Sequence, residues 1–312
     1  MSAQNTPAPE GVLILDKPAG MTSHDCVAIM RRLFHTKKVG HTGTLDPMAT
    51  GVLPILIGRA AKAAEYLTAE DKHYIAGLKL GLTTDTEDTT GQTLTTSSAI
   101  PDEETVQAAV RTFVGEILQT PPMYSALKVG GQKLVDLARQ GITVERQARP
   151  ITVFSIGCTR VEDDLYTLDV VCSKGTYIRT LCADIGAALG CGGAMASLRR
   201  AGSGTFSLDD AYTPDALEAM TDEERLALLR PTESLFSDLE ALSLPPFFER
   251  LCDNAVMSFL SDGRRVPFGA EPIIGYIFAR EAETTAIRTI ISGRMAGLDG
   301  NTIRQRLRRT YC

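Results

Sequence analysis

One acidic residue near the N-terminus stands in a segment where its carboxylate could do chemistry. Residues 41–51 read HTGTLDPMATG, and Asp46 is the sole acid in this run of small residues. A carboxylate can act as a nucleophile that forms and releases a covalent bond. The alternative is structural, because Asp-Pro is a common turn starter and Pro47 disfavours helical geometry at Asp46. This stretch alone leaves both interpretations open.

Aromatic and basic side chains begin two other segments. Tyr74 opens the run HYIAGLKL (73–80), whose alternation predicts a strand. The run SKGTYIRTLCADIGAAL (173–189) predicts a helix, in which Tyr177 and Arg179 flank the buried stripe in the first turn. Both side chains should therefore project from the N-terminal end of that helix. A simple turn at Asp46 does not explain why an aromatic residue and an aromatic–arginine pair begin these two other elements.

The elements that must position these residues are strands and helices in irregular order. Apolar runs predict strands at 12–15, 52–58, 151–157 and 165–172. Helices are expected behind the Thr22-Ser23-His24-Asp25 capping signature, from Arg59 onward in a short alanine-rich segment, and over 103–114. No strict βαβ rhythm and no fixed repeat appears. The pattern favours an α+β fold with a mixed, largely antiparallel sheet.

Composition excludes several classes of protein. A chain of 312 residues with 44% hydrophobic and 22% charged residues is typical of a globular protein. No apolar run approaches the ~20 residues of a membrane span. The start, MSAQNTPAPE, lacks the basic residues of a signal peptide, so a cytoplasmic protein with a disordered leader is expected. The seven cysteines form no CxxC pair and the four histidines are dispersed, which argues against a metal site.

The charge distribution permits a nucleic-acid partner despite a net charge of −6. Residues 246–312 contain 10 arginines and 7 acidic residues, a net charge of +3, whereas residues 1–245 carry −9. Basic residues also cluster at Arg31-Arg32, Lys37-Lys38, Arg199-Arg200 and within 123–141. An acidic protein can bind a polyanion if its basic residues share one face.

Five ordered blocks carry a resemblance to one family. They are GVLILDKPAGMTS, VGHTGTLDPMATGVLPILIGRAAK, HYIAGLKLG with TDTEDTTG, TPPMYSALKVGGQKLVDLARQG, and CSKGTYIRTLCADIG with LRRAGSGTF. In these blocks, which cover most of residues 11–206, the chain resembles the TruB family of bacterial tRNA pseudouridine-55 synthases. The resemblance implies an isomerase with the pseudouridine synthase catalytic fold, acting on the T-arm stem-loop of tRNA. It implies no cofactor, no metal, no membrane and no obligatory protein partner, and a monomer is expected.

The resemblance also implies roles for individual residues. Asp46 matches the family's catalytic aspartate, Arg179 the arginine that pairs with it, and Tyr74 the tyrosine that stacks on the target base. The remaining matches are to nucleotide-contacting positions at His41, Tyr177 and Leu198. Lys17 matches a Lys-Pro motif near the site and is expected among the substrate-binding residues. Alternatives stay open for the contact positions: a turn histidine at His41, a packing residue at Tyr177 and a core leucine at Leu198.

The implied reaction breaks the N1–C1′ bond, turns the uracil and joins C5 to C1′, so it requires no redox cofactor. Asp46 must be ionised in a desolvated pocket, and Arg179 would oppose the effect of burial. Whether Asp46 attacks C1′ or C6, or assists glycal formation, stays open. Tyr74 offers a stacking face worth about 1–3 kcal/mol, and its hydroxyl could help remove the C5 proton. When the target base flips out, it leaves an empty position in the base stack of the T loop. His41 is the candidate residue to fill that position.

The expected organisation has three parts. A leader (1–10) precedes a catalytic domain (11–245), which carries an RNA-clamping insertion at 123–141, and a small PUA-like RNA-binding domain follows at 246–312. Two rivals remain: a guide-RNA-dependent enzyme with the same fold, whose longer basic extensions this chain lacks, and an RNA chaperone that binds tRNA without modifying it. Chaperone activity could also coexist with catalysis.

Overall fold

The computed structural model describes residues 9–64, 68, 70–230, 287, 288, 290–292 and 294. In this part of the chain, one nine-stranded sheet organises the fold, with strand order β1-β3-β12-β4-β11-β10-β7, and β2 and β13 pair with β3 and β12. Every pairing is antiparallel except β3 with β12. The expected α+β class with a mixed, largely antiparallel sheet is therefore confirmed.

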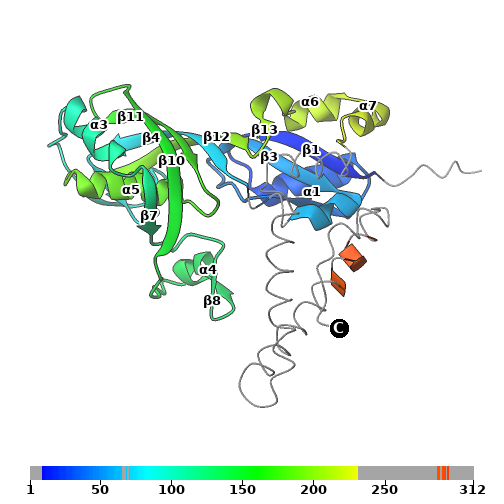
Figure 1. The fold of residues 1–312 in the computed structure, drawn as a ribbon, viewed down its shortest axis with the longest axis horizontal. Helices are drawn as coiled ribbons and strands as arrows, with labels where there is room; N and C mark the ends of the chain where they lie inside the picture. Colours follow the sequence, from blue (N-terminus) through cyan, green and yellow to red (C-terminus); the bar gives the residue numbers. More distant parts are fainter. Residues whose placement is uncertain are drawn as a thin grey trace, which may run out of the picture.

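The sheet is built from strands on both sides of the chain's midpoint. Its members are β1 (Gly11–Lys17), β2 (Val39–His41), β3 (Thr50–Ile57), β4 (Lys72–Leu80), β7 (Gly115–Gln119), β10 (Arg149–Arg160), β11 (Leu165–Cys172), β12 (Gly193–Ser203) and β13 (Phe206–Ser207). Two small hairpins stand apart, β5 (Leu82–Thr84) with β6 (Thr93–Thr96) and β8 (Lys128–Val129) with β9 (Gln132–Lys133). Figure 1 shows the long sheet running between two ends of the molecule, with β12 joining them.

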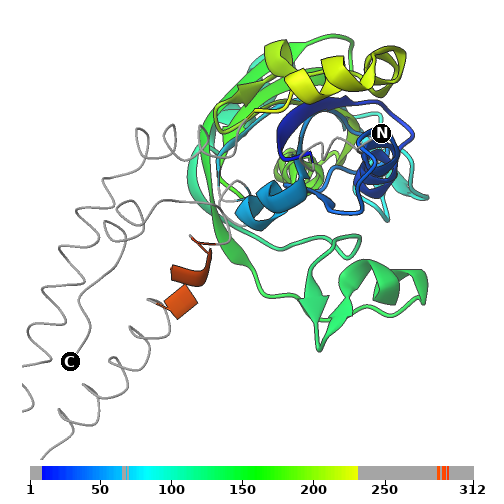
Figure 2. The ribbon, with the colours of Figure 1, turned by 90° about the vertical axis from the view of Figure 1, so that its right-hand side faces the viewer.

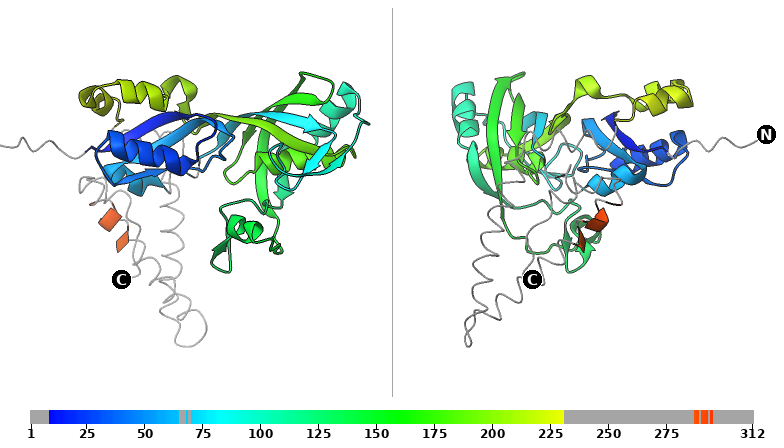
Figure 3. Two further views of the ribbon diagram at one scale, coloured as in Figure 1. Left: turned by 180° about the vertical axis from the view of Figure 1, so that it is seen from behind. Right: turned by 45° about the vertical axis from the view of Figure 1, so that its right-hand side comes forward.

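Helices cover the sheet at both ends. They are α1 (Ser23–Leu33), the 3-10 helix η1 (Gly58–Ala63), α3 (Glu103–Arg111), α4 (Leu134–Arg139), α5 (Ile178–Ala188), η2 (Leu208–Asp210), α6 (Pro214–Ala219) and α7 (Asp222–Ala227). Helices α3 and α5 lie at the β10–β11 end, and α1, α6 and α7 at the β1–β3 end (Figures 1 and 3). The core is continuous along the sheet and includes Leu13, Met30, Leu78, Leu168 and Leu181.

Local sequence explains where the first helix begins. Thr22 is its N-cap: the Thr22 hydroxyl accepts a bond from the Asp25 amide (3.1 Å), and the Asp25 carboxylate accepts one from the Thr22 amide (2.8 Å). Such capping stabilises a helix by about 1 kcal/mol. The expected helix is confirmed, whereas the predicted helix over 103–114 ends three residues earlier, at Arg111. The described start of the alanine-rich segment is a 3-10 helix.

The insertion at 123–141 contains the β8–β9 hairpin and α4, and it extends away from the sheet below β7 and β10 (Figures 1 and 2). Most of the leader and of residues 246–312 lies outside the described residues, so the expected PUA-like domain stays a prediction. No helix in the described part is long and apolar enough to cross a membrane. Within the same residues, no group of His, Cys, Asp or Glu has the arrangement of a metal site.

Candidate active site

The Asp46 loop connects β2 to β3, and the start of α1 fixes its position. Ser23, the first residue of α1, is buried. Its hydroxyl donates to the Leu45 carbonyl (3.2 Å) and accepts from the Leu45 amide (2.9 Å). Because both backbone groups of Leu45 are bonded to one side chain, the residue before Asp46 is held in place.

Lys17 holds the other side of the same loop. Its side chain is fully buried, and Nζ donates to the carbonyls of Ala49 (2.6 Å), Pro18 (2.9 Å) and Pro47 (3.3 Å). These three acceptors satisfy the three donors of an ammonium group. Burial lowers the pKa of Lys17, and the nearby Asp46 charge opposes this effect. Lys17 therefore supports the loop through its main chain, and its contact with substrate stays a prediction.

Asp46 and Arg179 form an ion pair across the sheet. Arg179 Nε lies 3.0 Å from Asp46 Oδ2, and Arg179 Nη2 lies 3.5 Å from Asp46 Oδ1. Nε and Nη2 lie along one edge of the planar guanidinium, so the two carboxylate oxygens meet two neighbouring N–H donors, which favours one orientation of the carboxylate. Thus two residues singled out from distant segments of the sequence are neighbours in the fold.

Arg179 has further partners that hold its guanidinium in place. Nη1 donates to the Thr86 carbonyl (3.0 Å) and lies 3.7 Å from Asp88 Oδ2. Nη2 donates to the Tyr124 carbonyl (2.7 Å), at the beginning of the insertion. The arginine therefore joins the Asp46 loop, the turn after β5 and the root of the insertion.

Electrostatics at Asp46 reflect two opposed effects. Burial raises the pKa of Asp46, and the negative charge of Asp88 acts in the same direction. The Arg179 charge and hydrogen bond lower it, with a smaller effect from Lys17. The carboxylate is thus held close to a fixed cation while its proton affinity is above that of an ordinary aspartate.

Tyr74 lies in β4 beside the Asp46 loop, and its side chain is buried. It is directly opposite Arg200 in the β4–β12 pairing and opposite Val170 on its other side. Burial raises the pKa of the Tyr74 hydroxyl above its ordinary value, and the Arg200 charge partly opposes this effect. The predicted strand is confirmed, and with it the placement of Tyr74, Ala76, Leu78 and Leu80 on the buried face.

Tyr177 and Leu198 occupy the same region. Tyr177 is the N-cap of α5; its amide donates to Gln119 Oε1 (2.8 Å), and its carbonyl accepts from Gln119 Nε2 (3.1 Å). Asp46 is among the charges that act on the Tyr177 hydroxyl. Leu198 is buried in the cluster that also contains Tyr74, so its core role is present in the structure. Their contact with a nucleotide stays a prediction.

His41 ends β2 at the start of the Asp46 loop. Its ring is half-buried and packs edge-on against His24, with 5.7 Å between ring centroids. Burial lowers the pKa of His41, and the neighbouring His24 and Arg200 act in the same direction. The His41 imidazole is therefore predominantly neutral at pH 7, and its Nδ1 has no hydrogen-bond partner in the described structure.

Sequence reasoning missed Asp88 and Arg200. Asp88 lies within the run TDTEDTTG and is buried, and its Oδ1 accepts bonds from the hydroxyls of Thr86 (2.9 Å) and Thr90 (2.5 Å). The dense threonine and aspartate content of this run was the available signal. The sequence grouped Arg200 with Arg199 as one basic cluster, but the two side chains lie in different surroundings. Arg200 is 1% exposed, whereas Arg199 forms a two-point ion pair with Asp16 (2.8 and 3.2 Å).

Two family descriptions match adjoining parts of the chain. The family description "TruB family pseudouridylate synthase (N terminal domain)" matches residues 31–178, and "tRNA pseudouridylate synthase B C-terminal domain" matches residues 179–237. A tRNA pseudouridine synthase B of Aromatoleum aromaticum is 47% identical over 238 residues, which cover 76% of this chain and 77% of the relative. One of Dechloromonas aromatica is 50% identical over 230 residues, covering 74% and 77%.

Solved structures are similar over the same part of the fold. A chain in a Cbf5-Nop10-Gar1 complex matches with a TM-score of 0.56 and 31% identity, covering 72% of this chain and 61% of that chain. A chain in an H/ACA RNP bound to a substrate RNA containing 2′-deoxyuridine matches with a TM-score of 0.53 and 27% identity, covering 74% and 66%. This chain spans less than two thirds of the first of these two chains.

Proposed function

This chain belongs to the TruB family of pseudouridylate synthases, and from that premise we propose that it converts uridine 55 in the T loop of tRNA to pseudouridine, with Asp46 as the nucleophile. The coarser activity, pseudouridylation of tRNA by an isomerase, follows from its relatives. The position in the tRNA and the residue roles are the proposal. It acts as a monomer in the cytoplasm, without an obligatory protein partner.

The Asp46–Arg179 pair carries the proposal. A nucleophilic carboxylate must be ionised, correctly oriented and open to its substrate. The Arg179 contacts at 3.0 and 3.5 Å supply orientation and an opposing charge, while 37% of the Asp46 side chain is exposed. A purely structural ion pair has no need of this exposure. Asp46 attacks C1′ or C6, or assists glycal formation; the pair is compatible with each of these steps.

The residues around the pair suit a flipped uridine. In the proposal Tyr74 stacks on the uracil, and Tyr177 and Leu198 contact the same nucleotide. The base must leave the T-loop stack to reach Asp46, and His41, at the mouth of the loop, fills the space that it leaves. A neutral His41 ring suits stacking, because burial of the imidazole keeps it uncharged.

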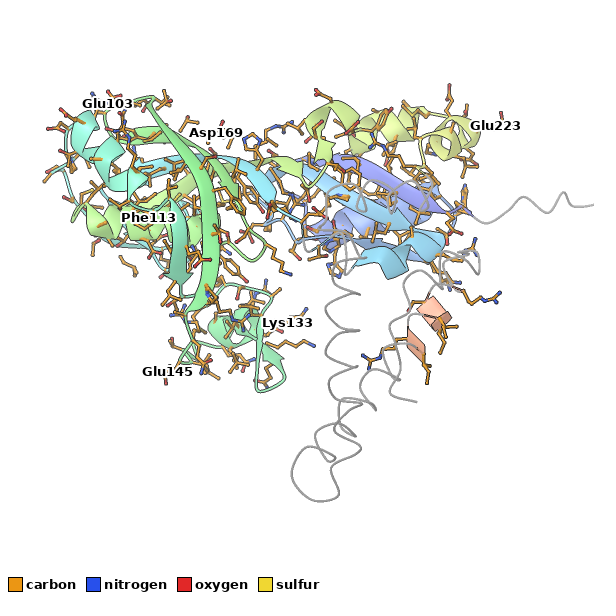
Figure 4. The ribbon with its side chains drawn as sticks, viewed as in Figure 1. Glu103, Phe113, Lys133, Glu145, Asp169 and Glu223 are labelled. Carbon is orange, nitrogen blue, oxygen red and sulfur yellow. The ribbon has the colours of Figure 1, made fainter. Side chains whose placement is uncertain are left out.

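The insertion at 123–141 has a charge arrangement that suits RNA. Lys128 and Lys133 lie directly opposite each other in the β8–β9 pairing, and both are exposed. Like charges at such a position destabilise a hairpin, so an external anion would relieve the repulsion. Figure 4 shows Lys133 in the part of the insertion that extends below the sheet. We assign this hairpin to the phosphate backbone of the T arm.

The rival functions make different predictions. An RNA chaperone would not require the Asp46–Arg179 pair, although chaperone activity could accompany catalysis. A guide-RNA-dependent enzyme would require a second RNA and protein partners, as in the solved complexes named above. The stand-alone enzyme is preferred, because relatives at 47–50% identity are named tRNA pseudouridine synthase B.

The testing experiment uses the hydrogen that C5 of uracil loses when C5 joins C1′. Transcript tRNA carrying tritium at uracil C5 should release label to water in the presence of the protein alone, and the modified position should map to uridine 55. Cytidine at position 55 should abolish release. A T-arm hairpin of about 17 nucleotides should also react if local shape is read. No release from tRNA at any salt concentration would reject the enzyme and leave the chaperone.

A further inference from the structure

We infer that Arg200 is a positioning residue for the reaction, which holds the Asp46 loop and Tyr74 in a fixed relation and supplies the counter-charge for a Tyr74 phenolate. The inference rests on the proposed function, because it assigns Tyr74 the removal of the C5 proton. It concerns a side chain that the substrate does not need to touch.

The burial of Arg200 requires an explanation. Its side chain is 1% exposed and is among the largest fully buried side chains of the described structure. No carboxylate in the described part of the chain lies within ion-pair distance of it. Burying a charge without an opposite partner is costly unless other groups compensate. The compensating groups therefore indicate what the cation does.

Two of these groups belong to the Asp46 loop and the strand that follows it. Arg200 Nε donates to the Val52 carbonyl (2.6 Å), and Nη2 donates to the Gly43 carbonyl (3.1 Å). Gly43 and Val52 lie on the two sides of Asp46 in the sequence. The backbone of β3 also approaches Arg200 closely: a Cβ at Gly51, whose φ is +103°, would lie 2.2 Å from the Arg200 carbonyl oxygen. The loop is thus fixed to β12 at both of its ends.

The third neighbour is Tyr74. Tyr74 and Arg200 are register partners on the adjacent strands β4 and β12. Burial raises the pKa of the Tyr74 hydroxyl, and the Arg200 charge opposes this effect. A phenolate oxygen beside this cation keeps lone pairs with which to accept a proton. One cation is therefore bonded to the loop that carries Asp46 and lies beside the aromatic residue proposed to face the base.

The other charged and titratable groups around Tyr74 do not replace Arg200. Cys172 on β11 and Asp46 in its loop both raise the pKa of the Tyr74 hydroxyl. Burial raises the pKa of Cys172 itself to about 11, so this thiol is neutral at pH 7. Lys72 on β4 lies close to Arg200, and burial together with the Arg200 charge lowers its pKa to about 8. A guanidinium, unlike these groups, carries its positive charge throughout the ordinary pH range of proteins.

The step that Arg200 supports is the last proton transfer. Once C5 is bonded to C1′, C5 still carries its hydrogen and C6 is doubly bonded to N1. The Tyr74 phenolate, having lost its own proton to solvent, takes the C5 hydrogen as a proton and becomes a phenol. The C5–H electron pair forms the C5–C6 double bond, the C6–N1 pair returns to N1, and N1 takes a proton from water. Arg200 stabilises the phenolate before this transfer.

The experiment compares Arg200→Met and Arg200→Lys with Arg199→Lys, a control in the adjacent, Asp16-paired arginine. Single-turnover rates at saturating tRNA are measured across pH with hydrogen or deuterium at uracil C5. For Arg200→Met we expect a single-turnover rate at least tenfold slower than that of the wild type. The ascending limb of its pH–rate profile should lie at higher pH, and the rate ratio between hydrogen and deuterium at C5 should be larger. Removing the cation raises the pKa of Tyr74, so less phenolate is present at a given pH. Arg200→Lys should move the pH–rate profile part of the way back to that of the wild type. Arg199→Lys should change neither the pH–rate profile nor the isotope effect.

Thermal unfolding shows which variants are folded, and Arg200→Lys provides the measurement if Arg200→Met does not fold. A slower folded Arg200 variant with an unchanged pH profile and unchanged isotope effect would reduce Arg200 to a structural residue and overturn the inference. That result is distinct from failure of the proposed function, in which the wild-type protein itself releases no C5 label. The latter outcome would overturn both.

Discussion

The side chain of Arg179 is only 7% exposed, whereas the Asp46 carboxylate that it holds 3.0 Å away is 37% exposed. The cation is fixed by the Thr86 and Tyr124 carbonyls, so it does not have to be ordered when a substrate arrives. The carboxylate keeps one side open. This asymmetry between a buried, preorganised partner and an accessible nucleophile is the basis of the first two predictions.

Asp46→Asn should fold, bind tRNA and form no pseudouridine. Asparagine preserves the size and turn preference of the residue but removes the nucleophilic charge. Tritium release and mass analysis of the tRNA measure the loss of activity, and filter binding measures the retained affinity. Turnover near that of the wild type, with deamidation excluded, would reject Asp46 as the nucleophile.

Arg179→Lys should lower the rate at saturating tRNA by at least tenfold and leave tRNA affinity within about threefold. Lysine keeps the charge but cannot present two neighbouring N–H donors to Asp46 while also donating to the Thr86 and Tyr124 carbonyls. Single-turnover rates and equilibrium binding separate the two effects. A collapse of affinity with an intact rate would instead identify Arg179 as a phosphate contact.

The lower limb of the pH–rate profile should report Asp46, below the pH range in which Tyr74 loses its proton. Because burial and Asp88 raise the pKa of Asp46, activity should fall on acidification at a higher pH than for an ordinary aspartate, as the nucleophile becomes protonated. Asp88→Asn removes a negative charge, so the acidic limb should move to lower pH even if the maximal rate drops. Asp169→Asn, at an exposed carboxylate on the outside of β11 (Figure 4), is the control and should leave the limb in place. If the acidic limb of the pH–rate profile stays in place in Asp88→Asn, a group other than Asp46 causes it.

Replacing Lys128 and Lys133 together with alanine should weaken tRNA binding and lower its salt dependence. Each lost phosphate contact should reduce the slope of log K against log salt by about one. Arg111→Ala, an exposed change on α3 away from the insertion, provides the control. An unchanged slope in the double variant would remove the hairpin from the RNA-binding surface.

Gly186→Ala should destabilise the protein although alanine favours a helix. Alanine gains about 1 kcal/mol over glycine in a helix interior. Here a Cβ would lie 2.0 Å from the Gly193 amide nitrogen, so α5 would have to move off β12. We expect a net loss of about 1–3 kcal/mol, since overpacking costs more than the propensity gains. Urea unfolding measures it, and an unchanged or increased free energy of unfolding would show that α5 is free to shift.

The sequence indicated the elements that follow clear periodicity. The α1 capping signature, the β4 alternation and the α5 stripe each led to the observed element, and Tyr74, Arg179 and Asp46 were singled out before the fold brought them together. The end of α3 at Arg111 was not predictable, because Thr112 and Phe113 are compatible with another helical turn.

Pairwise and buried relationships were less accessible from sequence. Arg199 and Arg200 are adjacent and chemically identical, so only the alternation of β12 decides that one reaches Asp16 at the surface while the other is buried against Tyr74. The burial of Lys17 against the Asp46 loop was hidden from the sequence for the same reason. A basic side chain in a strand carries no sign of which face it occupies unless the register is known.

The side chains of Ser23, Lys17 and Arg200 reach the Asp46 loop only through its main-chain atoms, at Leu45, at Pro47 and Ala49, and at Gly43. Main-chain acceptors are present whatever residue is encoded. The loop should therefore tolerate substitution at exposed positions such as Thr44, while the three side chains that hold it should be intolerant of change. A saturation library scored for activity would show this inversion: an exposed loop position next to the nucleophile would be more permissive than three residues outside the loop.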